Sequence, residues 1–396
     1  MSEQHLWDKK IGRRDFFKLS AMGAVAAVTA TALPSGLGTE PKKVSAAPRK
    51  FDIKPVAWSE CRNLTPQQMV DRAAMTGPGY EYLMDKAKNV KDAKVRKIAL
   101  EGLEGTRPKI LELYPDEASK QRTLMKLLDA GYVKSDNTTS QLFPPDKGPD
   151  TVIQNYKVSP GSGWMSHHAY PGGLIAHVAT DLQTALGVYD AYEQMYGYSL
   201  NYELLVSAIL LHDNQKPWVL QWKDDNSCLP EINVAGTGDH HIMEIADAIH
   251  RGLDPDLVIT IADSHEHPGW ESSEKQVVGW IKAASIIAGV DPIKSGYLAS
   301  NGETLPLPRR PEGFLVHLGD HDFVLTAPVC KWVAAELQKI TKPVYKFSDA
   351  DLKGKPFNTL RDYLYSQISD MHLYQIWVDQ GEKALLDTVT KIVIPE

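Results

Sequence analysis

Apolar residues recur at helical spacing through the middle of the chain. Leu174, Ile175, Val178 and Leu182 follow one another at intervals of one, three and four residues, which places them on one face of a helix. A shorter apolar run, residues 257–262, has the composition of a strand, but its neighbours favour a helix there too. Further helices are predicted over residues 204–211, 242–253 and 277–290.

The segments on either side of this central part are also expected to be helical. Residues 64–134 are rich in strong helix formers, and Thr65 followed by a proline suits a helix start. Towards the end, residues 328–341 and 360–394 show helical patterns, whereas residues 313–325 alternate in places and are compatible with a small β-hairpin. The expected fold is all-α, divided as follows: 1–50 signal and linker, 51–150 N-terminal helical region, 151–296 core, and 297–396 C-terminal, mostly helical region.

Composition and charge narrow the class of protein. Of the 396 residues, 43% are hydrophobic and 23% are charged, which is enough apolar material for a sizeable folded core. The net charge of −7 and the lack of a basic cluster beyond the N-terminus argue against nucleic acid as a partner. Cys61, Cys228 and Cys330 lie far apart and form no CxxC motif, so neither a disulfide framework nor a thiolate metal site is expected.

The N-terminus predicts export. Arg13 and Arg14 precede Phe16, Phe17 and a mild apolar run of 15 residues, 19–33, which is too short to span a membrane. A twin arginine before such a run resembles a Tat signal, which implies the Tat machinery as a partner and a periplasmic location. The alternative is a basic patch that happens to precede an apolar stretch. No later run is long enough for a permanent membrane span.

Several of the 13 histidines lie at the ends of predicted helices, together with aspartates. Imidazole and carboxylate ligands suit Fe, Mn, Zn, Ni or Co, whereas carboxylates alone favour Mg or Ca. His177 could instead be a core histidine, and His212–Asp213 could cap a helix, although a carboxylate is unfavourable at a C-terminus. The segment 317–322, HLGDHD, also looks ligand-like, but a turn explains it equally well. The remaining candidates are His240 or His241, His265 or His267, and Asp291.

Two motifs resemble the HD-domain superfamily of metal-dependent phosphohydrolases. The stretch HHAYPGGLIAHV, residues 167–178, is similar to a segment of some members, including exoribonuclease-type HD proteins. The family often reads HDIGK where this chain reads HDNQK, so Lys216 is kept and Gln215 replaces the usual glycine. The order H…HD…H…H…D also matches, and the resemblance covers residues 160–295.

The resemblance implies an all-α core with two divalent transition metal ions, among Fe, Mn, Ni, Zn and Co. In it Asp213 bridges both ions, and His241 and His265, preferred within their pairs, bind the second ion with it. Lys216 contacts a substrate oxyanion or a ligand carboxylate, and His168 lines the pocket with His167, so that Asp213, Lys216 and His168 are the expected catalytic residues. The other ligands of the first ion are His177, His212 and Asp291.

Three functions follow from this resemblance. The first is hydrolysis of a phosphomonoester or phosphodiester, in which two ions activate a water molecule towards a small-molecule substrate. The alternative is a mixed-valent di-iron oxygenase, because the altered HDNQK segment and the export signal both fit such a protein. A third is a binding module with a degenerate site, which ranks last because all six ligand types are present. An oligomer is compatible with the long terminal regions.

Overall fold

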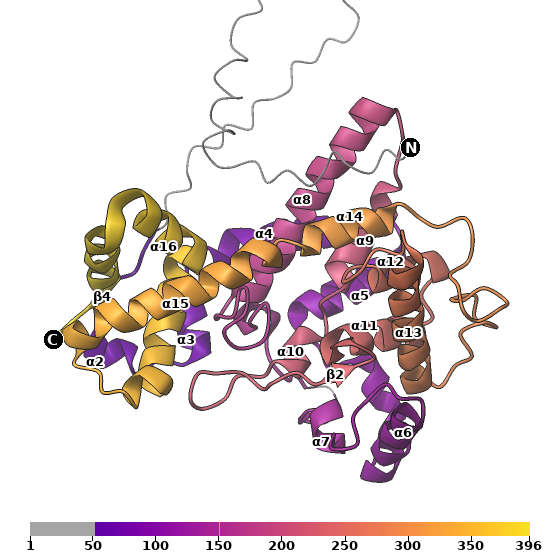
Figure 1. The fold of residues 1–396 in the computed structure, drawn as a ribbon, viewed down its shortest axis with the longest axis horizontal. Helices are drawn as coiled ribbons and strands as arrows, with labels where there is room; N and C mark the ends of the chain where they lie inside the picture. The colour runs from indigo at the N-terminus through magenta and orange to yellow at the C-terminus, as the bar shows by residue number, and fades with distance from the viewer. Residues whose placement is uncertain (1–51, 150) are drawn as a thin grey trace, which may run out of the picture. The chain divides into compact units, whose positions relative to one another are not determined.

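Helices form most of the body that the computed structural model describes, residues 52–149 and 151–396 (Figure 1). Strands in this part of the chain are limited to two short pairs, so the prediction of an all-α fold is confirmed. The expected export signal and linker, residues 1–50, lie outside the described residues. The strands are β1 (Val56–Ala57) parallel to β4 (Val393–Ile394), and β2 (Asn233–Val234) antiparallel to β3 (Thr237–Gly238).

The central helices form where the apolar spacing predicts them. The Asn201 side chain accepts a hydrogen bond from the backbone of Leu204 and caps the largely apolar helix that ends before His212. Residues 257–262 are helical. Their helix begins at Pro255, and the side chain of Asp254 caps its start. In this group α8 packs on α14, α9 on α12, and α11 on α13. The bounds are α8 (Gly173–Tyr196), α9 (Tyr202–Leu211), α10 (Lys216–Val219), α11 (Asp239–His250), α12 (Pro255–Ala262), α13 (Glu271–Ala288) and α14 (Glu312–Asp320).

The N-terminal region supplies short helices that cover the central group. The predicted start at Thr65 is present as a capping box with Gln68. Of these helices, α4 packs on α8 and α5 on α9. The bounds are α2 (Trp58–Cys61), α3 (Pro66–Val70), α4 (Thr76–Lys88), α5 (Ala93–Glu104), η1 (Lys109–Leu113), α6 (Glu117–Asp129), α7 (Thr139–Leu142) and η2 (Tyr156–Val158).

The segment 313–325 differs from the alternating pattern that allowed a hairpin there. It contains most of α14 and the start of α15, and the small hairpin of this fold is instead β2–β3. Leu315, Val316 and Gly319 are buried together, which is a helical spacing. Gly319 also allows a close approach to α8, because a Cβ there would lie 2.7 Å from the carbonyl oxygen of Asp181. Helix packing therefore decides the structure of this segment.

A second apolar cluster lies around α15 (Phe323–Tyr345) and α16 (Lys355–Ile392), which are joined by η3 (Asp351–Lys353). The two helices pack on each other, and α16 also contacts α2 and α3 (Figure 1). Within α16 the residues Ser369 and Gly381 have non-helical backbone dihedrals, so this long helix is kinked twice. Among the described helices none is long and apolar enough to cross a membrane.

Candidate metal centre

The loop before α8 folds tightly against the start of that helix, and this explains the YPGG motif in physical terms. Gly172 adopts a left-handed conformation at φ 88°. A Cβ on Gly173 would lie 1.8 Å from the carbonyl oxygen of His168, so only glycine fits there. The helix then presents His177, fully buried, one turn further on. The motif thus brings His167, His168 and His177 together, with a possible ligand atom of each within 4.8 Å of the others.

The end of α9 orients His212 towards His177. The Nδ1 atom of His212 lies 2.8 Å from the carbonyl oxygen of Ile209, which can only accept a hydrogen bond. Nδ1 therefore carries the proton, and in the neutral ring Nε2 is left with a free lone pair, which is the form that binds a metal. Asp213 follows at once, with both carboxylate oxygens buried. The helix end thus supplies two adjacent donors to one point.

Four donor atoms meet at this point. His177 Nε2 lies 3.0 Å from Asp213 Oδ2 and 3.2 Å from Asp320 Oδ1, and His212 Nε2 lies 3.4 Å and 3.7 Å from the same two atoms. Donors around one transition metal ion with bonds near 2.0–2.2 Å are separated by about 3.0–3.5 Å. None of the four residues is more than 4% exposed. Three of the four separations therefore fall in the range of a coordination shell, and the fourth, 3.7 Å, lies slightly beyond it.

The position expected for Asp291 is taken by Asp320. The Asp291 side chain is 47% exposed, and its carboxylate accepts hydrogen bonds from the backbone of Ile293 and Lys294 in the turn after α13. The structure does not bring it to the buried group. Asp320 reaches the group because α14 packs closely on α8 through Gly319. The signal for it in the sequence was HLGDHD, where two aspartates follow a buried helix face.

Lys216 lies against the carboxylate of Asp213. Its Nζ is 2.6 Å from Asp213 Oδ2 and donates to the carbonyl oxygen of Gly161, also at 2.6 Å. Burial alone would lower the pKa of Lys216, but the carboxylates of Asp213 and Asp320 raise it above its usual value. The residue therefore stays charged although it is 2% exposed. It ties the end of α9 to the loop before α8.

A second set of imidazoles lies on the other side of Asp213. His240 Nε2 is 3.6 Å from Asp213 Oδ1, while its Nδ1 is hydrogen-bonded to Glu231. His265 Nε2 is 3.7 Å from Asp320 Oδ2, while its Nδ1 is 2.9 Å from Thr237 Oγ1. A histidine whose second nitrogen is held in this way is oriented as a metal ligand usually is. Both rings are therefore directed at the carboxylates of the first group.

The remaining members of the two histidine pairs differ in position. His241 is fully buried and stacks on His265, with ring centroids 4.0 Å apart. Its Nε2 has no hydrogen-bond partner among the described residues, so it stays a candidate beside His240. His267 instead packs against Phe314, with centroids 4.9 Å apart. The structure thus places His265 at the group, together with both His240 and His241.

Two further carboxylates, Asp181 and Asp322, belong to the group, and neither was among the predicted ligands, although Asp322 lies in the ligand-like segment 317–322. Asp181 lies one turn after His177, with Oδ2 3.4 Å from His177 Nδ1 and 3.6 Å from His212 Nε2. Burial raises the pKa of Asp181 well above its usual value. Asp322 Oδ2 lies 3.7 Å from His168 Nε2. The i, i+4 spacing of His177 and Asp181 could have revealed the first, because such residues share a helix face.

The loop that carries His167 and His168 is held from α16 by Arg361. This side chain is fully buried, and its guanidinium lies 3.6 Å from the ring centroid of Trp164. It donates to the carbonyl oxygen of Ala169 at 2.7 Å and pairs with Asp362 at 2.7 Å. The C-terminal region therefore contributes to the shape of the site.

Buried polar atoms without partners test whether this group fits a metal. Each such atom costs about 1–3 kcal/mol if nothing satisfies it, so a concentration of them needs a reason. Coordination to an ion would satisfy them together, and a buried group of histidine and aspartate could hold metal ions. The atoms without hydrogen-bond partners among the described residues include both ring nitrogens of His177, both carboxylate oxygens of Asp181, Oδ1 of Asp213, and Nε2 of His212, His240 and His241.

A cavity of about 330 Å³ opens on the group. Its lining residues come from the loop before α8, the β2–β3 hairpin, α13 and the start of α15. Lys216, His240, His265 and Asp320 reach it from the buried group, and His167 reaches it from the loop. Of the four converging donor residues, Asp320 therefore faces a space that a small molecule can enter.

Fold and site together define a helical protein with a buried histidine–aspartate group suited to metal ions. Over 116 residues the chain is 29% identical to a dihydroneopterin 2′,3′-cyclic phosphate phosphodiesterase of Methanocaldococcus jannaschii. The aligned part is 29% of this chain and 45% of that relative, less than half of its length. No family model and no solved structure matches the chain. The similarity supports a hydrolase in general terms.

Proposed function

We propose that the protein is a metal-dependent phosphodiesterase of the HD type, with two divalent ions. The observation that carries this proposal is the set of four donor atoms from His177, His212, Asp213 and Asp320, spaced as around one ion. The similarity to a phosphodiesterase supports phosphate esters as the substrate class.

The proposed ligands form two sets, and Asp213 belongs to both. Its Oδ2 faces the first group, and its Oδ1 faces His240 Nε2 at 3.6 Å. We assign the second ion to Asp213, His265 and either His240 or His241. Ions held by these residues would supply an activated water molecule and would polarise a phosphoryl group.

The chain's own residues have separable tasks in this proposal. Lys216 keeps Asp213 in place and presents a positive charge at the cavity, where it can neutralise a phosphate oxygen. Glu231 holds Nδ1 of His240, which fixes the direction of Nε2. His167 lines the cavity and is the histidine of the HHAYPGG segment placed to exchange a proton with a leaving group. His168 is not among the residues that line the cavity, and its ring lies next to Asp322.

Export remains part of the proposal. The twin-arginine segment, Arg13–Arg14 with the apolar run after it, would send the protein through the Tat route to the periplasm. Such a route transports folded proteins, so the metal would be inserted before export. The substrate would then be a small phosphate ester present outside the cytoplasm.

The test is hydrolysis of bis(p-nitrophenyl) phosphate by the full chain loaded with Mn²⁺, Ni²⁺ or Mg²⁺. We expect turnover that depends on the metal and is lost, together with bound metal, in His212→Ala and Asp213→Ala. The matched control is His250→Ala, because His250 is a partly exposed histidine near Glu112, away from the buried group. If the purified protein holds two irons by EPR and cleaves no phosphate ester with any metal, the oxygenase alternative replaces this proposal.

A further inference from the structure

A cavity of about 400 Å³ lies between α15 and α16, and it shares no lining residue with the cavity at the metal centre. Trp332, Ala335 and Glu336 reach it from α15, and Tyr374 and Trp377 reach it from α16. Residues three and four apart share a helix face, so each helix contributes one face to this space. Trp332 is 48% exposed, and a solute can therefore reach the rings from outside.

The three aromatic rings of this cavity stand at angles to one another. The centroids of Trp332 and Tyr374 are 5.6 Å apart with an interplanar angle of 39°, and those of Tyr374 and Trp377 are 6.2 Å apart at 81°. A ring attracts a cation within about 6 Å of its centroid, so one cation can lie within reach of two neighbouring rings at once. Among the described residues no lysine or arginine lies over any of these three rings.

Negative charge predominates beside the rings. Glu336 is the charged residue among those that line the cavity, and its side chain is 11% exposed. Its Oε1 lies 3.1 Å from Lys339 Nζ, and Lys339 also pairs with Glu382 on α16. Two carboxylates thus share one ammonium group, and the three side chains together have a net charge of −1. The charge beside the rings therefore favours a cation.

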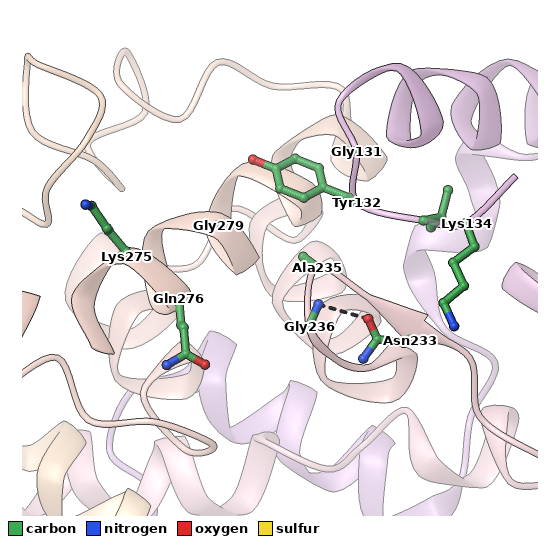
Figure 2. A pocket seen from close by; sticks show the side chains of 10 residues that line it. Gly131, Tyr132, Lys134, Asn233, Ala235, Gly236, Lys275, Gln276 and Gly279 are labelled. Atoms are coloured by element: carbon green, nitrogen blue, oxygen red, sulfur yellow. Dashed lines mark hydrogen bonds between the residues drawn. The ribbon is translucent and has the colours of Figure 1, made fainter. Parts of the chain in front are cut away.

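The cavity of about 430 Å³ at the β2–β3 hairpin lacks such an arrangement. Lys134 and Lys275 are its charged lining residues, and Figure 2 shows them at opposite ends of the cavity, directed away from each other. Their charges do not meet at one point. Between α15 and α16, by contrast, adjacent rings contact one another and a carboxylate lines the same space.

We propose that the cavity between α15 and α16 binds a small solute with a trimethylammonium group, of the choline class. A quaternary ammonium has no N–H to donate, so aromatic faces and a nearby carboxylate are the groups that attract it in proteins. Tyr374 and the two tryptophans supply the faces, and Glu336 supplies the charge. Pockets for small molecules span about 300–1,000 Å³, and the cavity of about 400 Å³ is at the lower end of that range. This inference is independent of the proposed function.

The experiment is isothermal titration of the full chain with choline and with 3,3-dimethylbutan-1-ol. The alcohol has the shape of choline, with an uncharged carbon in place of the quaternary nitrogen. Each exposed ring that faces the cation should strengthen binding by about 2- to 5-fold, so we expect choline to bind about 10-fold more tightly or better. Binding should be the same with and without added metal, because the two cavities share no lining residue.

Variants assign the preference to the rings. Trp332→Leu/Trp377→Leu removes two aromatic faces but keeps apolar side chains, and it should lose most of the preference for choline. Glu336→Gln should weaken the binding of choline and leave that of the alcohol unchanged. The matched control is Trp270→Leu, because Trp270 is 79% exposed and does not line the cavity. This variant should keep the full preference, and circular dichroism checks that each variant is folded.

Two results overturn the inference: equal binding of choline and the alcohol by the wild type, or an undiminished preference in the double tryptophan variant. The first comparison needs no variant, so it stands even if the double variant does not fold. Sedimentation with phosphatidylcholine vesicles, with phosphatidylglycerol vesicles as the control, distinguishes a lipid headgroup from a free solute. Binding to phosphatidylcholine vesicles without binding of choline contradicts the small solute. The proposed function is tested separately, by hydrolysis of the phosphate ester.

Discussion

Replacing Asp320 by Asn should remove metal from the protein, whereas the same change at Asp291 should not. Asp320 contributes one of the four converging donor atoms, 3.2 Å from His177 Nε2, and it is 4% exposed. Burial alone would raise the pKa of Asp320, but the adjacent imidazoles of His177 and His212 hold it well below its usual value, so a full negative charge is lost.

The expected loss of metal affinity can be estimated from mutations that disturb a metal ligand less. Residues that only orient a ligand change metal affinity by about 10–100-fold when mutated. Loss of a charged ligand itself should therefore weaken binding by at least about 100-fold, which corresponds to about 2.8 kcal/mol. Asp291→Asn keeps a side chain that can cap the same turn, so its effect on stability should stay within about 0.5 kcal/mol.

The assay is competition with a chromogenic chelator, with bound metal counted by mass spectrometry after dialysis against Mn²⁺ or Zn²⁺. Circular dichroism melting of the metal-free proteins checks that both variants fold. If Asp291→Asn loses the metal and Asp320→Asn retains it, the assignment of the coordination shell from the structure is wrong.

Three further predictions concern the support of the site. Gly173→Ala should destabilise the protein by about 1–3 kcal/mol, because its Cβ would lie 1.8 Å from the carbonyl oxygen of His168. The control is Gly187→Ala on the same helix, where a Cβ meets nothing within 4 Å. Chemical denaturation measures the free energy of unfolding of both variants. Arg361→Met should cost about 3–5 kcal/mol by leaving Asp362 buried without its partner, and a melting temperature equal to wild type contradicts that. Burial raises the pKa of Asp370 from 3.8 to about 6, so the folded state holds its proton more tightly and this residue lowers stability as pH rises from about 4 to 6. Asp370→Asn should remove that loss, about 3 kcal/mol, and a stability difference from wild type that does not change between pH 4 and 7 speaks against it.

The helices and the first members of the buried histidine–aspartate group were predictable because the evidence for them is local. Leu174 to Leu182 carry a helical period, and His177 and His212 follow from their places on two helices. The start at Thr65 was visible as a cap and a proline. In each case a few consecutive residues hold the information.

The carboxylate that completes the group was not predictable in this way. Asp291 is the next aspartate after the last predicted helix of the core, so it fits an ordered series of ligands. Asp320 reaches the site only because Gly319 lets α14 approach the backbone of α8, a contact between residues far apart in the chain. Spacing along one segment does not report such contacts.

The choice between His240 and His241, which are adjacent at the start of α11, could not be made from the sequence for a different reason. His240 and His241 differ by about 100° around α11, and either direction is compatible with the apolar face that follows. The orientation of His240 depends on Glu231, which precedes the β2–β3 hairpin, and that of His241 on stacking with His265. The sequence around His240 and His241 does not indicate that Glu231 and His265 are their partners.

The hold of Arg361 on the Trp164 loop has a consequence for how this chain can be divided. A fragment of residues 151–296 would keep His177, His212 and Asp213 but lose both Asp320 and the guanidinium beside Ala169. It would be a helical fragment with an incomplete ligand set and an unsupported loop. The buried group and the support of its loop therefore extend into α16, and an insertion or exchange at the boundary near residue 296 would separate residues that contact one another.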